Sequence, residues 1–149
     1  MLNIQKATLS DLPDLMALLH LLFEQEAEFE PNAEAQRKSL FKIISDSKIG
    51  MIWVAKNDEK TVGMVSLLFT ESTALGSVVA LLEDMVVLPA YRGKGIGSQL
   101  VDHAIREAKS LGCQRITLLT DLDNVKAQNF YTQRGFRSSK MMPLRLLLQ

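Results

Sequence analysis

The sequence predicts an α/β fold, with a mixed central sheet of about seven strands and about four helices in a single domain spanning residues 1–149. Helix-like and strand-like segments alternate, and no linker or repeat interrupts them. Residues Ser77 to Leu88 are nearly all apolar, which is typical of a central strand covered on both faces. A helical segment connects this strand to another one, from Gln114 to Thr120. Because a helix joins the two strands, we expect them to run parallel.

The first half of the chain predicts a strand, two helices and a hairpin. Residues Leu2 to Ala7 form the expected first strand. Apolar residues then recur at three- and four-residue spacing, as on one face of a helix: Leu12, Leu15, Met16, Leu19, Leu22 and Phe23. A second helix restarts after Pro31. Ile49–Lys56 and Thr61–Thr70 are strands separated by a short polar turn, which indicates a β-hairpin.

The part of the chain after the apolar strand Ser77–Leu88 predicts two helices and three further strands. An amphipathic helix runs from Ile96 to Leu111, and Gly112 suits its C-terminal end. Val125 to Arg134 is a shorter helix. After it, Phe136 begins an expected final hairpin, with Met142 to Leu148 as the last strand.

Composition excludes several classes of partner. Seventeen basic residues balance seventeen acidic ones, so the net charge predicts neither nucleic-acid nor anionic-membrane binding. The single cysteine, Cys113, excludes an internal disulfide and a Cys-rich zinc site, and we expect no metal. No segment resembles a signal peptide or a membrane span. These features indicate a protein of the reducing cytoplasm.

The segment from Arg92 to Gly97 reads Arg-Gly-Lys-Gly-Ile-Gly, and it lies directly between the apolar strand and a helix. Glycines let the backbone approach a ligand, and a helix N-terminus attracts an anion. The segment lacks the spacing of a P-loop, and Ser98 stands where the dinucleotide fingerprint needs a third glycine. A phosphate-binding loop and a plain glycine-rich turn both remain open at this point.

Two motifs make the chain resemble the GNAT superfamily of N-acetyltransferases. Arg92-x-x-Gly95-x-Gly97 looks like motif A of that family. Asn124-x-x-Ala127-x-x-Phe130-Tyr131-x-x-x-Gly135-Phe136 resembles its motif B, and the order of elements is similar along the whole chain. The resemblance implies a GNAT fold whose sheet is splayed between strands 4 and 5.

The resemblance also implies acetyl-CoA as co-substrate. Backbone N–H groups of the loop would hold its pyrophosphate, the strand before the loop would pair with the pantetheine arm, and an N–H near Val86 would polarise the thioester carbonyl. Asn124 would bond the arm or cap its own helix. The implied cofactor-binding residues are Met85, Val86, Val87, Arg92, Gly93, Lys94, Gly95, Ile96, Gly97, Ser98, Asn124 and Tyr131.

Two side chains are candidates for catalysis. Tyr131 matches the family's general acid, and the alternative is simple packing beside Phe130. Glu83 is the expected general base, acting directly or through water. Alternation along a strand would place Glu83 and Asp84 on opposite faces unless a bulge intervenes, and Asp84 is expected to be a structural hydrogen-bonding residue.

The expected reaction is transfer of an acetyl group to a primary amine by direct attack in a ternary complex. Glutamates at positions 24, 26, 28 and 30 suggest an acidic rim for a cationic acceptor such as a polyamine, or simply a solvated helix end. A peptide or protein amine is the alternative acceptor, and a non-catalytic acyl-CoA sensor is the alternative function. A homodimer is a further expectation from the resemblance.

Overall fold

The computed structural model describes residues 1–25 and 32–148. Short 3-10 turns at Leu9–Asp11 and Pro89–Tyr91 precede α1 and the glycine-rich loop. The strands and helices are, in chain order, β1 (Leu2–Lys6), α1 (Leu12–Gln25), α2 (Ala33–Ser45), β2 (Gly50–Asn57), β3 (Lys60–Ser72), β4 (Ser77–Val87), α3 (Ile96–Ser110), β5 (Ile116–Leu118) and α4 (Val125–Gln133).

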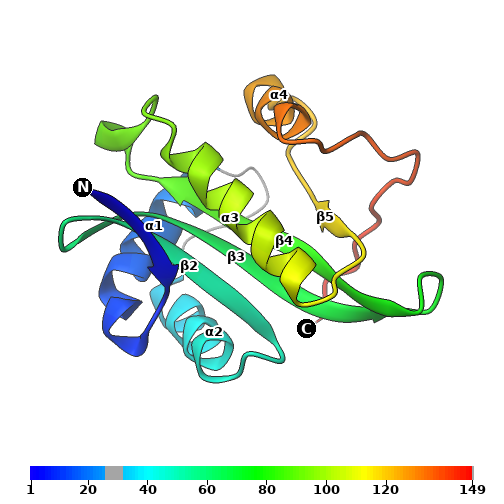
Figure 1. The fold of residues 1–149 in the computed structure, drawn as a ribbon, viewed down its shortest axis with the longest axis horizontal. Helices are drawn as coiled ribbons and strands as arrows, with labels where there is room; N and C mark the ends of the chain where they lie inside the picture. Colours follow the sequence, from blue (N-terminus) through cyan, green and yellow to red (C-terminus); the bar gives the residue numbers. More distant parts are fainter. Residues whose placement is uncertain (26–31, 149) are drawn as a thin grey trace.

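The strands form one mixed sheet in the order β1-β2-β3-β4-β5 (Figure 1). Neighbouring strands are antiparallel except β4 and β5, which are parallel as predicted. The α/β class and the four helices are confirmed.

The predicted final hairpin is wrong, and the sheet of the described residues has five strands instead of about seven. Residues 136–148 form neither helix nor strand. The segment from 137 to 142 contains no glycine, proline, asparagine or aspartate, and its only turn formers are Ser138 and Ser139. Serine hydroxyls form such local turns more weakly, and the one at Ser139, which accepts the N–H of Met141 at 3.0 Å, is not followed by a paired strand.

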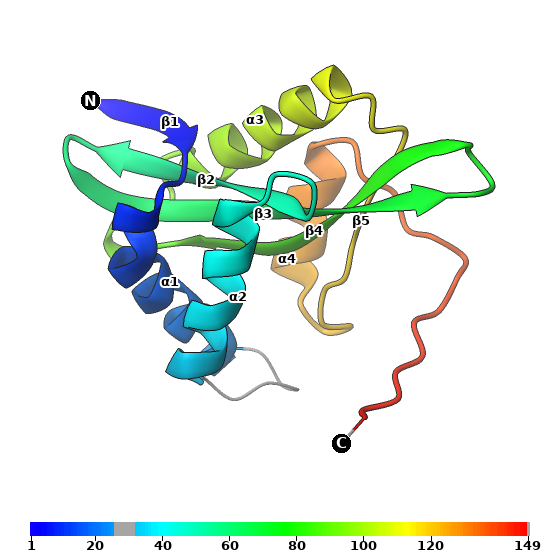
Figure 2. The same cartoon turned by 90° about the horizontal axis from the view of Figure 1, so that it is seen from below.

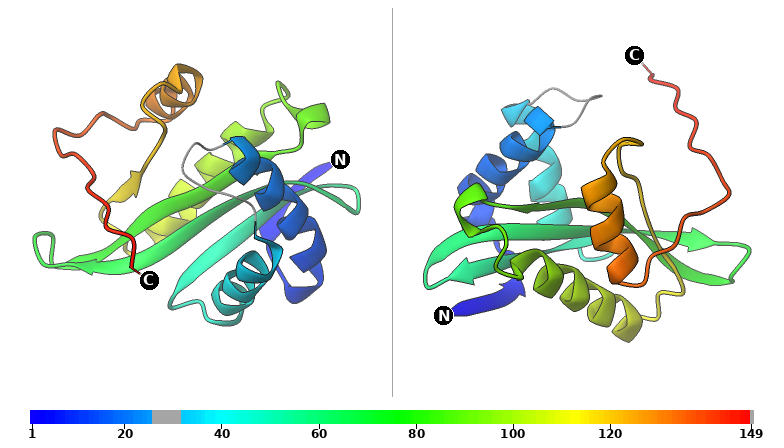
Figure 3. Two further views of the ribbon diagram at one scale, coloured as in Figure 1. Left: turned by 180° about the vertical axis from the view of Figure 1, so that it is seen from behind. Right: turned by 90° about the horizontal axis from the view of Figure 1, so that it is seen from above.

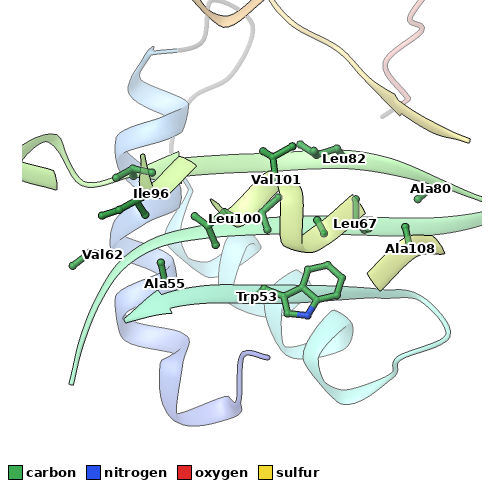
Figure 4. Close-up of a cluster of buried hydrophobic side chains, with 13 residues drawn as sticks. Trp53, Ala55, Val62, Leu67, Ala80, Leu82, Ile96, Leu100, Val101 and Ala108 are labelled. Carbon is green, nitrogen blue, oxygen red and sulfur yellow. The ribbon is translucent and has the colours of Figure 1, made fainter. Parts of the chain in front are cut away.

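Helices cover both faces of the sheet, with α1 and α2 on one face and α3 on the other (Figure 2). The cluster between the sheet and α1 and α2 includes Leu15, Leu18, Leu40, Ile52, Val54, Met64 and Val86. The cluster under α3 is built around Trp53, Val65, Leu67, Leu82, Leu100, Val101 and Ala104 (Figure 4). Burying one such large side chain contributes about 1.5–3 kcal/mol to stability, so the two clusters hold β4 firmly between the helical layers.

An ion pair fixes the start of α1 to the sheet. The Nζ atom of Lys56 lies 2.6 Å from Oδ1 of Asp11, a side chain only 3% exposed. The N–H of Thr8 donates to Oδ2 of the same carboxylate at 2.8 Å. Burial alone would raise the pKa of Asp11, but the bonds from Lys56 and Thr8 outweigh it and lower that pKa below 3.8.

Within the described part of the chain, none of the helices combines the length and the apolar character that crossing a bilayer requires.

Candidate active site

The sheet opens between β4 and β5. Their pairing covers only Ala80–Leu82 opposite Ile116–Leu118. β4 continues for five residues, Glu83 to Val87, beyond the last of these pairs, and no described strand pairs with them on the β5 side. An open strand edge presents unpaired N–H and C=O groups, so an extended ligand can bond there as a further strand would.

The register with β3 tells which main-chain groups face this opening. The N–H of Leu88 donates to the carbonyl of Val62 at 2.8 Å, so Leu88 points its N–H toward β3. The direction of the main-chain N–H and C=O groups alternates along a strand. Those of Val86 therefore also point toward β3, whereas those of Met85 and Val87 point toward the opening.

A side-chain contact agrees with this assignment. The carbonyl of Val87 accepts a bond from Nε of Arg92 at 3.1 Å, which ties the start of the glycine-rich loop to the end of β4. Val86 is only 4% exposed and packs in the cluster under α1 and α2. The N–H groups on either side of Val86 that face the opening are therefore those of Met85 and Val87.

The glycine-rich loop leaves a run of backbone donors unused. Gly93 and Gly95 have φ angles of 76° and 80°, in the left-handed region that glycine adopts without a steric penalty. The N–H of Arg92 donates to Pro89 at 3.3 Å, so the unused run begins after it. Among the described residues, no protein acceptor meets the N–H groups of residues 93–98. With Gly95 as the N-cap of α3, these unused donors are of the kind that an anion site at a helix N-terminus requires.

Basic side chains surround the ring of Tyr91 next to this loop. The Nζ atoms of Lys94 and Lys60 lie 5.3 Å and 5.7 Å from the ring centroid. A pocket of 330 Å³ adjoins them; it is lined by Leu2, Asn57, Tyr91, Lys94, Ile96 and Gln99. Positive charge here complements a phosphate-bearing ligand.

Helix α4 forms the far wall of the opening. Its N-cap is Asn124, whose side chain accepts a bond from the N–H of Ala127 at 3.1 Å. This satisfies one of the two alternative roles predicted for Asn124. A Cβ atom added to Gly97 would lie 3.5 Å from Phe130 and 3.6 Å from Met85, so α3, α4 and β4 converge at this glycine.

Tyr131 lies on the inner side of α4. Its ring makes edge contacts with Phe130 and Phe136, at centroid distances of 5.0 Å and 5.6 Å. Burial, and then the charge of Asp84, raise the pKa of Tyr131 to about 12. The phenol therefore stays protonated at neutral pH. The predicted packing beside Phe130 is present, and it is compatible with a role as donor.

A β-bulge positions the two adjacent carboxylates of β4. The register between β3 and β4 shifts between Val65 and Leu67, so the single residue Ser66 stands opposite both Glu83 and Asp84. The bulge that the sequence left as an alternative is thus present. Ser66 was not predicted; a lone serine in an apolar strand was the only signal.

The bulge moves both carboxylates to one face. Leu82 and Met85 both pack in the cluster under α3, so the two acidic residues between them share the opposite face, that of α1 and α2. The hydroxyl of Ser66, 1% exposed, accepts the N–H of Asp84 at 3.1 Å and donates to its Oδ2 at 3.5 Å. Asp84 is half-buried and Glu83 is exposed.

The two histidines and the cysteine lie outside this site. His20 is a surface residue paired with Glu24 at 2.7 Å, and His103 is half-buried with its ring 5.7 Å from that of Trp53. Burial raises the pKa of Cys113, which disfavours its thiolate. Glutamates 26, 28 and 30 lie outside the described residues. Residues 1–25 and 32–148 contain no cluster of acidic, histidine and cysteine side chains with the arrangement of a metal site.

Comparisons with known proteins show the family. The sequence model of the acetyltransferase (GNAT) family matches residues 13–136. An aminoalkylphosphonate N-acetyltransferase from Salmonella typhimurium is 29% identical over 137 residues, which cover 92% of this chain and 86% of that protein.

Solved structures share the fold. A crystal structure described as a transcriptional regulator from Bacillus halodurans is 33% identical, covers 99% of this chain and 100% of that one, and has a TM-score of 0.82. An aminoglycoside N-acetyltransferase in complex with CoA has a TM-score of 0.84 over 99% of this chain and 95% of that one; at 19% identity it supports the fold alone. The chain belongs to the GNAT family and is an acetyl-CoA-dependent N-acetyltransferase.

Proposed function

We propose that the enzyme transfers the acetyl group of acetyl-CoA to a primary amine by direct attack, with both substrates bound at the opening between β4 and β5. The observation that carries this proposal is the open edge of β4, which leads at one end to unused N–H groups and at the other to two carboxylates. The loop adjoins α3 on one face of the sheet, and the two carboxylates lie on the face of α1 and α2. The donor and the acceptor can therefore approach the thioester from different faces.

The donor would bind along β4 and the glycine-rich loop. N–H groups of residues 93–98 would hold the pyrophosphate, and Lys94 would add charge beside it. Main-chain groups of Met85 and Val87 would bond the pantetheine arm. The N–H of Met85 would also polarise the thioester carbonyl, in the manner of an oxyanion hole.

The chemistry requires one proton acceptor and one proton donor. The amine nitrogen attacks the carbonyl carbon, a C–N bond forms, and the C–S bond breaks. Glu83 accepts the amine proton, directly or through water. The Tyr131 hydroxyl donates to the departing sulfur. Since a thiol has a pKa near 8.5, a phenol of pKa about 12 mainly stabilises the thiolate by hydrogen bonding, and the proton released by the amine balances the reaction.

The properties of Cys113 support a direct route over an acyl-enzyme. Its raised pKa keeps the thiol protonated and therefore a poor nucleophile. Its side chain belongs to a separate hollow beside the end of α3. The single reduced cysteine also supports a cytoplasmic location.

We propose a cationic small molecule, such as a polyamine, as the acceptor. Glu83 and Asp84 share the face of α1 and α2, and two carboxylates there attract an ammonium group. The relative named aminoalkylphosphonate N-acetyltransferase suggests an alternative acceptor, a small amine that also carries an anionic group. Peptide amines are the other alternative, and each class makes a distinct prediction in one experiment.

The test is thiol release from acetyl-CoA over a panel of polyamines, aminoglycosides, aminoalkylphosphonates, amino acids and peptides. We expect turnover above hydrolysis with a diamine or polyamine, and a KM that rises with salt because screening weakens the attraction. If only anionic or uncharged amines react, the acceptor assignment is wrong. If acetyl-CoA binds and no amine reacts, the chain is an acyl-CoA sensor instead.

A further inference from the structure

Ser66 is a buried polar residue in the middle of the sheet, and the proposed reaction gives it no role. It lies on β3, which runs between β2 and β4 (Figure 3), and it is only 1% exposed. Its neighbours along the strand, Val65 and Leu67, are fully buried in the cluster under α3. Burying a hydroxyl in such surroundings is unfavourable unless it is hydrogen-bonded, so its contacts with β4 explain how the fold accommodates it.

The hydroxyl of Ser66 supplies a hydrogen-bond acceptor where the ladder between β3 and β4 is interrupted. A bulge leaves its extra residue unpaired in the ladder, and a buried N–H without an acceptor destabilises the fold. Here the N–H of Asp84 donates to Oγ of Ser66 at 3.1 Å. Regular pairing resumes on either side, at Leu82 and Met85. The serine side chain therefore stabilises the bulge at its interrupted point.

The same hydroxyl limits where the carboxylate of Asp84 can lie. Ser66 stands between two residues that face α3, so it faces α1 and α2, as Asp84 does. Because Oγ accepts the N–H, its own hydrogen is free to donate, and Oδ2 of Asp84 lies 3.5 Å away. This distance is long for a hydrogen bond, so the main-chain contact is the stronger of the two and the carboxylate contact adds direction.

The position of Asp84 affects both side chains that the reaction uses. Glu83 precedes it in the bulge and shares its face of the sheet. The charge of Asp84 also acts on Tyr131, since after burial it is the second cause of the raised pKa of the phenol. An anion near Tyr131 opposes negative charge on the departing sulfur. A displacement of Asp84 would therefore alter the surroundings of the base and of the leaving group together.

We propose that Ser66 is a positioning residue for the acetyl transfer: its hydroxyl stabilises the bulge and fixes Asp84, and it thereby sets the placement of Glu83 and Asp84 relative to Tyr131. The proposal rests on the reaction and the base proposed above. Ser66 acts through β4 and not by contact with either substrate. Since a small misplacement of reacting groups can reduce a rate about 100-fold, loss of this hydroxyl should lower kcat more than it weakens CoA binding.

The first test needs no turnover and detects the position of Asp84 through the phenol. In a Tyr91→Phe background, absorbance near 295 nm measures the ionisation of Tyr131 in the folded protein. Ser66→Ala releases the carboxylate, so the pKa of Tyr131 should fall, by no more than Asp84→Asn lowers it. In the Asp84→Asn background, Ser66→Ala should have no further effect, because both changes act through one charge. An unchanged titration in Ser66→Ala, or equal shifts in both backgrounds, would overturn the proposal.

The second test compares Ser66→Thr with Ser66→Val, two variants of nearly equal size that differ in the hydroxyl. In thiol release with the best amine of the panel, Ser66→Thr should retain most of the activity. Ser66→Val should have a kcat about 10- to 100-fold lower than Ser66→Thr, with the Kd of CoA unchanged. The control is Thr61→Val on the same strand: among the described residues, its buried hydroxyl meets no hydrogen-bond partner, so kcat should not change. Equal kcat in the two Ser66 variants would refute the positioning role.

These experiments separate the positioning role from the proposed function. If no amine reacts with the natural chain, the proposed reaction is wrong, and the titration still tests whether Ser66 fixes Asp84. If amines react and the hydroxyl at position 66 alters neither the titration nor kcat, only the positioning role fails. Circular dichroism shows whether each variant is folded. If Ser66→Thr or Ser66→Val is not folded, Ser66→Ala, which adds no volume, takes its place in the comparison of kcat.

Discussion

Replacing Asp84 by asparagine should lower the pKa of Tyr131 without returning it to its ordinary value. Two causes raise this pKa to about 12: burial of the phenol is the larger, and the charge of Asp84 is the second. Asp84→Asn removes the charge and keeps a side chain that Ser66 can still bond. Because burial remains, the pKa should fall but stay above 10.

The pKa of Tyr131 is raised enough for its ionisation to be compared at pH 10.5, without strongly alkaline conditions. At pH 10.5 a phenol of pKa 12 is about 3% ionised, whereas one of pKa 10 is about three-quarters ionised. The difference between a pKa of 10 and a pKa of about 12 corresponds to about 3 kcal/mol. The sign follows from the raised pKa: folding stability is unaffected below pH 10, and it decreases between pH 10 and 12, where the unfolded chain ionises first.

The chain suits this assay because Tyr91 and Tyr131 are its only tyrosines. In a Tyr91→Phe background, phenolate absorbance near 295 nm reports Tyr131 alone. Circular dichroism at the same pH shows that the protein remains folded. We expect almost no phenolate at pH 10.5, and more in the variant that also carries Asp84→Asn.

Two results would refute this reasoning. If Tyr131 in the folded protein is mostly ionised at pH 10.5, it is not buried in the way described. If Asp84→Asn leaves the titration unchanged, the carboxylate does not act on the phenol, and the two groups do not share the site.

Three further predictions concern the loop, the base and the ion pair. Gly95→Ala should weaken CoA binding about tenfold in calorimetry, since left-handed backbone costs a non-glycine residue about 1–2 kcal/mol. The control is Gly76→Ala, which is equally left-handed but lies in the β3–β4 turn and should leave the affinity for CoA unchanged. Equal losses of affinity in both variants would contradict the role of the loop. Glu83→Gln should reduce kcat about 100-fold or more at neutral pH and recover as alkaline pH deprotonates the amine; a constant deficit at every pH would oppose its role as base. Asp11→Asn should cost about 3–5 kcal/mol in urea unfolding at pH 7, because it leaves a lysine without its buried partner. The difference in unfolding free energy between the natural chain and this variant should become smaller below pH 3.8, because protonation of Asp11 then removes the stabilisation that its lowered pKa reflects. The control is Asp58→Asn, which removes an exposed charge pair and should change the unfolding free energy little at any pH.

Periodicity was sufficient to predict most of the fold. The apolar run of β4 and the amphipathic pattern of α3 were sufficient because the spacing of apolar residues indicates which face of an element is buried. The final hairpin failed for a related reason. Met142 to Leu148 have the apolar pattern of a buried strand, but such a pattern does not supply a neighbouring strand to pair with, and the leucines of this segment are exposed.

The backbone of the loop was predictable because it depends on local features. The left-handed glycines Gly93 and Gly95 and the start of α3 follow from the residue types, and the binding role of this loop stays a prediction. Ser66 could not be predicted, because its role depends on a register shift between β3 and β4. The faces of Glu83 and Asp84 depend on the same shift, which no local pattern encodes.

The most direct test of the site is the kinetics of Tyr131→Phe with the best amine of the panel. A phenylalanine keeps the ring contacts of α4 and removes only the donor hydroxyl. We predict that kcat falls about 100- to 10,000-fold while the Kd of CoA stays unchanged, as for loss of a group that acts in the transition state. An unchanged kcat would contradict placement of the thioester sulfur beside Tyr131.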